Sequence, residues 1–209
     1  MKKIFFSVIV LVCSVLFFSC TSEIGILLNK DGSVDVRFEG SSGLAFATLI
    51  RTAAGVEEGD VVFDTREITA ELTKNNFSSV NAVSKKGTDL SISMKDLQRK
   101  SPLFTSGVAS VKDGKLFAIL SADRLLNFYK ASDEEVVSFL DMLLAPVFND
   151  EVLSIEEYID TIASFYGNEA AEEINTSNFK ITLTNADGTS RVFTIPIAKL
   201  LTIDEVIEM

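Results

Sequence analysis

The sequence contains no histidine and no tryptophan, and only two cysteines and three prolines among its 209 residues. Without histidine, the chain cannot form a Ser-His-Asp triad, a Cys-His dyad or a His-ligated zinc site. It also lacks the usual general base near neutral pH. The absence of tryptophan removes a common aromatic platform for binding sugars. The chemistry that remains is that of carboxylate, lysine, tyrosine and serine side chains.

The two cysteines, Cys13 and Cys20, both lie in the first 20 residues, so the chain after Cys20 has no thiol. That part cannot form a disulfide, a thiolate nucleophile or an iron–sulfur site. With histidine absent as well, we expect no cofactor, no metal ligands and no catalytic residues of these classes. The fold must therefore be held by its hydrophobic core alone.

Positive charge is scarce too, since 19 lysines and arginines stand against 30 aspartates and glutamates, a net charge of −11. Nucleic-acid binding requires a basic surface that neutralises phosphates, so we expect no nucleic-acid partner. An anionic bilayer would repel this chain for the same reason. Any attachment to a membrane must come from apolar groups.

The long apolar run of the sequence lies at its N-terminus. Two lysines precede the 15 residues 4–18, a run shorter than the roughly 20 apolar residues of a membrane span. Positive charge, an apolar core and a small residue, in this order, are typical of a secretory signal peptide. The stretch Leu16-Phe17-Phe18-Ser19-Cys20 resembles the lipobox of bacterial lipoproteins. Phe17 and Ser19 stand where that motif most often has Leu and Ala or Gly.

This resemblance implies that residues 1–19 are a signal peptide, cut between Ser19 and Cys20, and that Cys20 is the lipid attachment site. Residues 20–23 are then expected to be the lipidated N-terminus and a short tether. Acyl chains such as palmitate would anchor the protein to a membrane of the cell envelope, facing the periplasm or the cell exterior. Two alternatives are an uncleaved anchor helix and cleavage by the general signal peptidase.

Asp-Gly turns separate several segments in which apolar and polar residues alternate. The turns are at residues 30–32, 112–114 and 186–188, and the segments beside them include 34–38, 116–120 and 179–184. This combination is the strongest short-range signal of a β-hairpin, because glycine accepts the positive φ that a tight turn requires. A fourth hairpin is predicted to turn at residues 86–88, which gives eight strands.

Helices are predicted in the remaining segments. Residues 43–54 form one, and Asp64 with Glu67 is a capping pair for another that ends near Lys74. The pattern becomes helical between residues 121 and 167, with two S-x-x-E capping boxes, Ser132 with Glu135 and Ser154 with Glu157.

The two capping boxes each precede an apolar stripe. The stripes are Val136, Phe139, Leu140, Leu143, Leu144 and Val147 in the first helix, and Ile155, Tyr158, Ile159, Ile162 and Phe165 in the second. Because a short loop at residues 149–153 joins these helices, we expect antiparallel neighbours that bury their stripes against each other and the sheet.

Hairpins and locally grouped helices indicate an α+β fold rather than a parallel α/β sheet. We expect four β-hairpins that form a mostly antiparallel sheet, or two small sheets, packed against the helical block. Residues 24–209 are predicted to form a single domain. A second interpretation has two lobes divided near residues 95–106.

Three features of the sequence suggest catalysis or metal binding, but each has a structural explanation or the wrong spacing. Ser177 and Lys180 match S-x-x-K, but at the start of a strand, where residues three apart point to opposite faces. The Asp-Gly turns lack carboxylates at the first and last positions of a calcium loop. The acidic clusters at residues 133–135, 150–160 and 169–173 are explained by helix capping and the helix dipole.

These exclusions favour a membrane-anchored envelope lipoprotein that is a non-enzymatic binding or structural module. Its partners would be the membrane, through the acyl chains, and an envelope protein or an apolar ligand. One alternative is a carrier or chaperone that holds an apolar ligand between the sheet and the helices of residues 132–167. A second is a carboxylate-dependent hydrolase, which requires two carboxylates roughly 5–10 Å apart.

Overall fold

The structure is a computed structural model that describes residues 21–209, except 46, 49–50, 52–62, 86–88 and 131–152. The strands are β1 (Thr21–Leu28), β2 (Val34–Ser41), β3 (Ser78–Lys85), β4 (Asp89–Asp96), β5 (Ala109–Lys112), β6 (Lys115–Leu120), β7 (Asn178–Thr184), β8 (Ser190–Pro196) and β9 (Ile207–Glu208). The helices are α3 (Thr65–Lys74), α4 (Pro102–Thr105), α5 (Ala122–Lys130), α7 (Ile155–Tyr166), α8 (Asn168–Thr176) and α9 (Ile197–Leu201).

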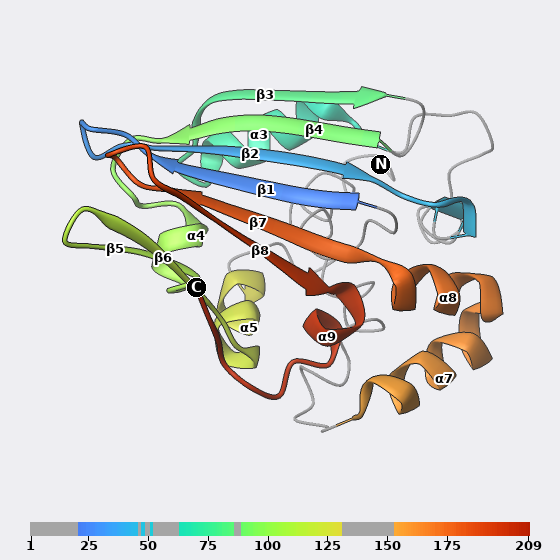
Figure 1. The fold of residues 1–209 in the computed structure, drawn as a ribbon. Coiled ribbons are helices and arrows are strands. Elements are labelled where there is room, and N and C mark those ends of the chain that lie inside the picture. The colour runs from blue at the N-terminus through green and yellow to red at the C-terminus, as the bar shows by residue number, and fades with distance from the viewer. Residues whose placement is uncertain (1–20, 46, 49–50, 52–62, 86–88, 131–152) are drawn as a thin grey trace.

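The fold class is α+β, as predicted. A six-stranded sheet has the order β3-β4-β2-β1-β7-β8, and β5, β6 and β9 form a second, three-stranded sheet (Figure 1). All four predicted hairpins are present as antiparallel strand pairs. The large sheet is mixed because β1 and β7 pair in parallel. This pairing joins the C-terminal hairpin to the two N-terminal hairpins.

The turn chemistry behind the hairpin prediction is observed at three positions. Gly32, Gly114 and Gly188 have φ angles of +83°, +73° and +87°, which lie in a region that residues other than glycine rarely occupy. Asp113 also has a positive φ, of +52°, so the β5–β6 turn has the two left-handed residues typical of a tight hairpin. The turn at residues 86–88 lies outside the described residues.

One cluster of buried apolar side chains lies between the sheets and the helices. Alternation along the strands supplies it, with Ile24, Ile26 and Leu28 of β1 all below a tenth exposed. Leu116 of β6 and Tyr158 of α7 belong to the same cluster. Burial raises the pKa of the Tyr158 phenol far above its usual range. Both sheets therefore share one core in the part of the chain that the structure describes.

The predicted helix starts are confirmed where the structure describes them. At α3, the Asp64 carboxylate accepts a hydrogen bond from the backbone N–H of Arg66 at 2.9 Å. At α7, Ser154 and Glu157 form the reciprocal capping box, with N–H to side-chain distances of 2.9 and 3.2 Å. The backbone N–H and hydroxyl of Ser154 lower the pKa of Glu157.

The structure describes the second helix of the predicted pair, α7. The first helix of the pair, with the box at Ser132 and Glu135 and the loop up to residue 152, lies outside the described residues. The stripe of α7 is buried at its middle but not at its ends, since Ile155 is 39 % and Phe165 76 % exposed. The expectation of a fully buried stripe is therefore wrong. Among the described elements, α7 packs on α8 and α9, two helices the sequence patterns did not predict.

The expected tether at residues 20–23 is also corrected by the structure. Thr21–Glu23 are the first residues of β1, and Ser22 is buried between Gly40 of β2 and Phe179 of β7. Pairing with β2 extends to Thr21, the first described residue, and pairing with β7 extends to Ser22. The sheet therefore begins at Thr21, the residue that follows Cys20 in the sequence.

The chain leaves the large sheet at the end of β4, where Asp96 holds the following loop. This side chain is fully buried, and its carboxylate accepts hydrogen bonds from the backbone N–H groups of Gln98 (3.0 Å), Lys100 (3.1 Å) and Ser101 (2.9 Å). Burial alone would raise the pKa of Asp96, but these hydrogen bonds outweigh it and the pKa is lowered. The carboxylate is therefore held in its ionised form.

The small sheet is fastened to the β7–β8 hairpin through the backbone of Leu116, which is fully buried. Its N–H donates to Oδ1 of the buried Asn185 at 2.9 Å, and its carbonyl accepts from the guanidinium of Arg191. The same guanidinium lies 5.4 Å from the centre of the Phe117 ring, within cation–π distance. Both backbone polar groups of Leu116 are thus satisfied by side chains of the β7–β8 hairpin.

We predict that Asp96→Asn lowers the free energy of unfolding by about 2 kcal/mol at pH 7. Asparagine replaces a charged acceptor with a neutral one, which forms weaker hydrogen bonds with the backbone N–H groups. The lowered pKa means that this stabilisation is present above the unfolded-state pKa of about 3.9 and is lost as pH falls through the folded-state value. The difference between the variant and the original protein should therefore shrink in acid. Urea unfolding at several pH values measures it, with the exposed Asp204→Asn as control. A difference independent of pH would contradict the assignment.

Candidate functional site

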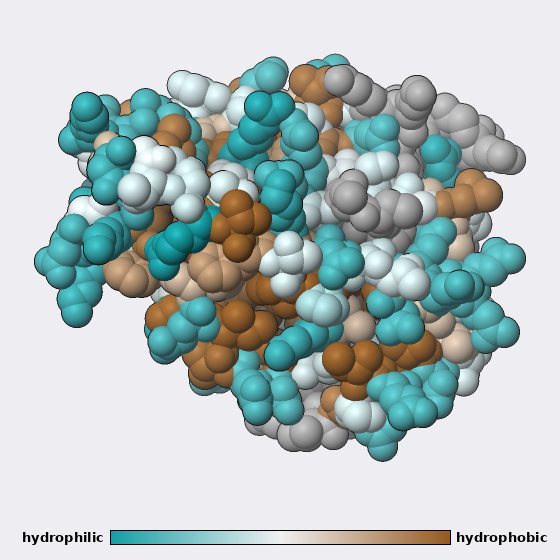
Figure 2. All heavy atoms as spheres, viewed as in Figure 1, coloured by the Kyte–Doolittle hydropathy of each residue, from teal (hydrophilic) through white to brown (hydrophobic). Residues whose placement is uncertain are grey.

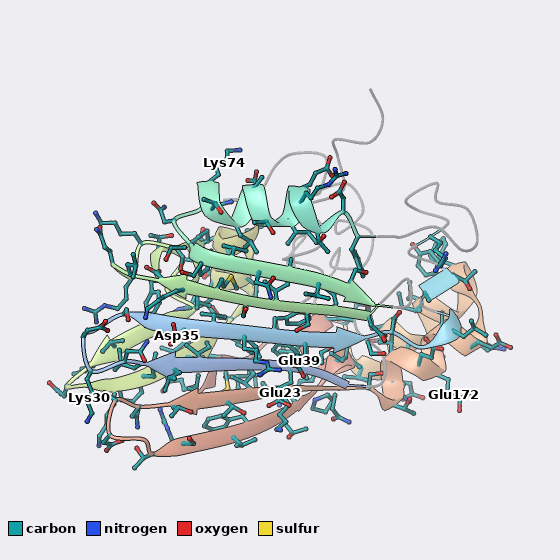
Figure 3. All side chains as sticks on the ribbon, turned by 90° about the horizontal axis from the view of Figure 1, so that it is seen from above. Glu23, Lys30, Asp35, Glu39, Lys74 and Glu172 are labelled. Atoms are coloured by element: carbon teal, nitrogen blue, oxygen red, sulfur yellow. The ribbon has the colours of Figure 1, made fainter. Side chains whose placement is uncertain are left out.

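Strand alternation gives the six-stranded sheet a second face, which we call the outer face. Its residues lie opposite the core-facing ones on the same strands and are half-buried or exposed. Figure 3 shows the sheet from above, with Glu23, Asp35 and Glu39 on the two central strands. The polar residues here are a predictable result of a sheet that packs its apolar side on helices.

The strand register arranges the outer face in three rows. The turn-side row is Ser78, Lys95, Asp35, Leu27, Thr184 and Ser190; the middle row is Asn81, Ser93, Arg37, Gly25, Thr182 and Val192; and the start-side row is Val83, Ser91, Glu39, Glu23, Lys180 and Thr194. Each row places side chains of six strands side by side across the sheet. Hydroxyl groups and charges of both signs therefore alternate over one continuous surface.

In the turn-side and start-side rows, charged side chains form ion pairs between neighbouring strands. Lys95 lies 3.6 Å from Asp35, and Lys180 lies 3.1 Å from Glu23. Because these groups are partly exposed, each pair contributes little to stability. Their effect is to fix the positions of the charges on the face.

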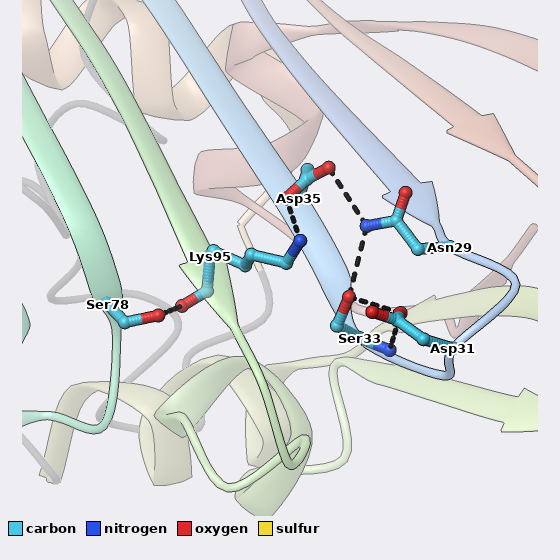
Figure 4. Close-up of polar contacts among 6 residues, drawn as sticks. All are labelled: Asn29, Asp31, Ser33, Asp35, Ser78 and Lys95. Atoms are coloured by element: carbon cyan, nitrogen blue, oxygen red, sulfur yellow. Dashed lines mark hydrogen bonds and ion pairs between the residues drawn. The ribbon is translucent and has the colours of Figure 1, made fainter.

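The turn-side row continues into the β1–β2 turn through Asn29 (Figure 4). Its amide donates to Asp35 at 2.9 Å and to the hydroxyl of Ser33 at 3.2 Å. Asp31 accepts from the backbone N–H of Ser33 at 2.9 Å, and the hydroxyl and N–H of Ser33 lower the pKa of Asp31. Asp35 is thus held from two sides, by Asn29 and by Lys95.

Two carboxylates stand directly opposite each other in the start-side row. Glu23 of β1 and Glu39 of β2 are register partners, an arrangement that normally destabilises a sheet. A cation lies beside each of them, Lys180 beside Glu23 and Arg37 beside Glu39. The four side chains form two neighbouring ion pairs at the start-side border of the outer face.

The middle row contains a glycine where neighbouring strands carry larger side chains. A Cβ added to Gly25 would meet only the carbonyl oxygen of Arg37, at 4.0 Å. Neither a positive φ nor a close neighbour requires glycine at this position. A glycine inside a strand often marks a place where another backbone or a ligand approaches closely. Among the described residues of the outer face, Gly25 is therefore one that folding does not explain.

An open hollow of about 450 Å³ lies over this glycine. Residues that line it include Gly25, Leu27, Asp35, Arg37, Ser93 and Lys95. A second hollow of about 360 Å³ adjoins it over the start-side row, and Arg37 lines both. The two hollows offer hydroxyl groups, backbone and charges of both signs to a partner lying across the strands.

This arrangement suits binding better than acid–base chemistry. The side chains of Glu23 and Glu39 are 46 % and 52 % exposed and each is paired with a cation, whereas an acid catalyst needs a carboxyl group kept protonated by burial. Among the described residues, no group of three or more carboxylates, histidines and cysteines is placed to hold a metal ion.

The residues singled out in the sequence lie apart from this face or at its border. Ser19 and Cys20 lie outside the described residues. Ser177 ends α8 and its buried hydroxyl donates to the carbonyl of Glu173, while Lys180 points to Glu23 on the outer face. The S-x-x-K match therefore forms no serine–lysine pair.

The sequence interpretation missed the outer face as a site. The sequence feature that could have indicated this face is Gly25, a glycine on the polar side of an otherwise regular strand. None of the helices that the structure describes is both long enough and apolar enough to cross a membrane. No family model matches the chain, and no curated protein or solved structure is significantly similar to it.

We predict that Gly25→Val leaves the free energy of unfolding unchanged or raises it by up to about 1 kcal/mol, because valine favours strands and its side chain enters open space. The matched control is Gly188→Val, whose φ of +87° is a backbone conformation that β-branched residues rarely adopt. Urea denaturation should show a loss of stability for the second variant only. A marked loss at Gly25 would mean that folding itself requires this glycine.

Proposed function

We propose that this protein is a membrane-anchored bacterial envelope lipoprotein and a non-enzymatic binding module, and that its outer face binds a polar macromolecular partner. The observation that carries the binding role is Gly25, a glycine at the centre of the sheet that folding does not require, beneath a hollow of about 450 Å³. The lipobox resemblance at Cys20 supports the anchor.

The composition of the outer face supports a partner rich in polar groups, to which Leu27, Val83 and Val192 add apolar contacts. Its three rows carry serine, threonine and asparagine side chains together with ion-paired charges of both signs. Such a surface recognises a partner through hydrogen bonds and matched charges, which give specificity and orientation more than affinity.

The acidic character of the domain fits the same proposal. Loss of the first 19 residues removes Lys2 and Lys3 and leaves 17 basic against 30 acidic side chains, a net charge of −13. Repulsion keeps such a domain soluble and away from anionic lipids. The domain would therefore present its outer face to proteins in the envelope while the acyl chains supply attachment.

The anchor is tested by the intact mass of the native protein. We expect a chain that begins at Cys20 and carries acyl groups, and Cys20→Ala should move the protein from the membrane to the aqueous fraction, because one chain anchors marginally and two or more anchor stably. An unmodified Cys20, or a chain that still begins at Met1, would overturn the lipoprotein proposal.

The binding role is tested by site-specific photo-crosslinking in intact cells. A crosslinking residue at Thr182, beside Gly25 in the middle row, should form one defined adduct with an envelope protein, whereas the same residue at the exposed Val206 should not.

Gly25→Arg fills the hollow and should abolish that adduct, while Val206→Arg should leave it unchanged. Protein level and denaturation midpoint are measured in parallel for both variants. An adduct that survives Gly25→Arg in a folded protein would exclude the outer face as the binding surface.

A further inference from the structure

We propose that the domain rests on the bilayer with one particular end, and that Leu44 and Phe165 enter the lipid interface there. We call this the starting end: the end of the large sheet at which β1 and β7 begin and β2 finishes. The inference rests on the proposed lipidation of Cys20. It adds a lipid-contacting surface to the protein and an orientation to its outer face.

The first argument is the absence of a spacer. Thr21 already pairs with Ser41, and Ser22 is 1 % exposed between β2 and β7. Consecutive Cα atoms lie about 3.8 Å apart, so a lipid on Cys20 is attached within one residue of the sheet. A domain held this closely cannot rise away from the headgroups, and the starting end must face them.

The second argument is the location of the most exposed apolar side chains. Among the large hydrophobic residues that the structure describes as exposed, Leu44 (84 %) and Phe165 (76 %) have the highest values. Leu44 follows the end of β2 by three residues. Phe165 lies in the last turn of α7, which packs on α8, and α8 leads directly into β7. Both residues therefore belong to the starting end.

Contacts between elements keep these two regions together. The Glu173 carboxylate of α8 accepts a hydrogen bond from the backbone N–H of Ala45 at 3.0 Å. Figure 1 shows α8, the end of α7 and the residues after β2 beyond the end at which β1 starts. In Figure 2, hydrophobic side chains gather over the region of α5, α7 and α9, whereas hydrophilic ones cover most of the strands.

The charges at the starting end define the lipid that fits. Exposed acids of α8 lie here, Glu169 and Glu172, the second labelled in Figure 3. Anionic headgroups would repel them, so the contact must be made by apolar side chains in a zwitterionic surface. The proposed contact therefore differs from that of basic peripheral proteins, which are attracted to anionic lipids.

An upright sheet follows from this contact. The eight residues of β1 rise about 3.3 Å each, which places the turn after Leu28 about 26 Å from its start. Leu97 lies near that distal end, because it follows Asp96, the register partner of Val34 at the start of β2. With 59 % of its surface exposed, Leu97 is the matched control for Leu44 and Phe165.

The absence of tryptophan from the chain makes the test direct. Leu44→Trp, Phe165→Trp and Leu97→Trp are each made in the full, processed protein, and its acylation is verified by intact mass. The proteins are incorporated into phosphatidylcholine vesicles with and without brominated acyl chains. We expect blue-shifted emission and at least about two-fold quenching for Leu44→Trp and Phe165→Trp, and neither effect for Leu97→Trp. Replacing half of the lipid by phosphatidylglycerol should reduce the quenching.

The outcomes separate the two proposals. An acylated, vesicle-bound protein whose Leu44→Trp and Phe165→Trp remain unquenched overturns the orientation and leaves the lipoprotein proposal standing. Equal quenching at Leu97→Trp also overturns it, because the domain would then have no preferred end. An unmodified Cys20 overturns both. Circular dichroism of each variant confirms that the tryptophan has not unfolded the domain.

Discussion

The parallel pairing of β1 with β7 is the contact on which the rest of the architecture depends. It brings residues such as Glu23 and Lys180, 157 positions apart, to neighbouring places in one sheet. Without it the β7–β8 hairpin would have no partner strand, and the two N-terminal hairpins would leave β1 as an open edge. The core-facing side chains of β1 and β7 also meet here, so the same pairing closes the centre of the hydrophobic core. Such a long-range contact is entropically costly to form and implies slow folding compared with local hairpins.

The attachment of the small sheet depends indirectly on the pairing of β1 with β7. Asn185 and Arg191, which bind both polar groups of the Leu116 backbone, belong to the β7–β8 hairpin and are in place only when β7 is. The buried Asp96 fixes the loop that carries the chain from the large sheet towards β5. Polar side chains rather than apolar packing alone therefore determine how the two sheets meet.

Local chemistry explains which elements could be predicted from the sequence. The hairpins were predictable because Asp-Gly turns and alternation are short-range features, and α3 and α7 because Asp64 and Ser154 cap them within a few residues. The helix α8 was missed because only Ala170, Ala171 and Ile174 mark its buried side, and its acids resemble a solvated segment. The parallel pairing and the strand β9 depend on distant partners. Gly25 acquires meaning only when the two faces of the sheet are known, so the candidate site could not be derived beforehand.

The strand that begins at Thr21 has a consequence for how the protein would meet its partner. If Cys20 carries the lipid, the domain can diffuse laterally in the membrane and rotate about the membrane normal. It has no spacer that would let it reach partners farther from the membrane surface. Its binding partner must then come to within a layer about as thick as one folded domain of this size, roughly 30–40 Å. A partner on the same membrane would be concentrated in that layer, so that even a weak contact with the outer face would be well occupied. A partner held on an opposing surface would be reached only where the two surfaces come that close.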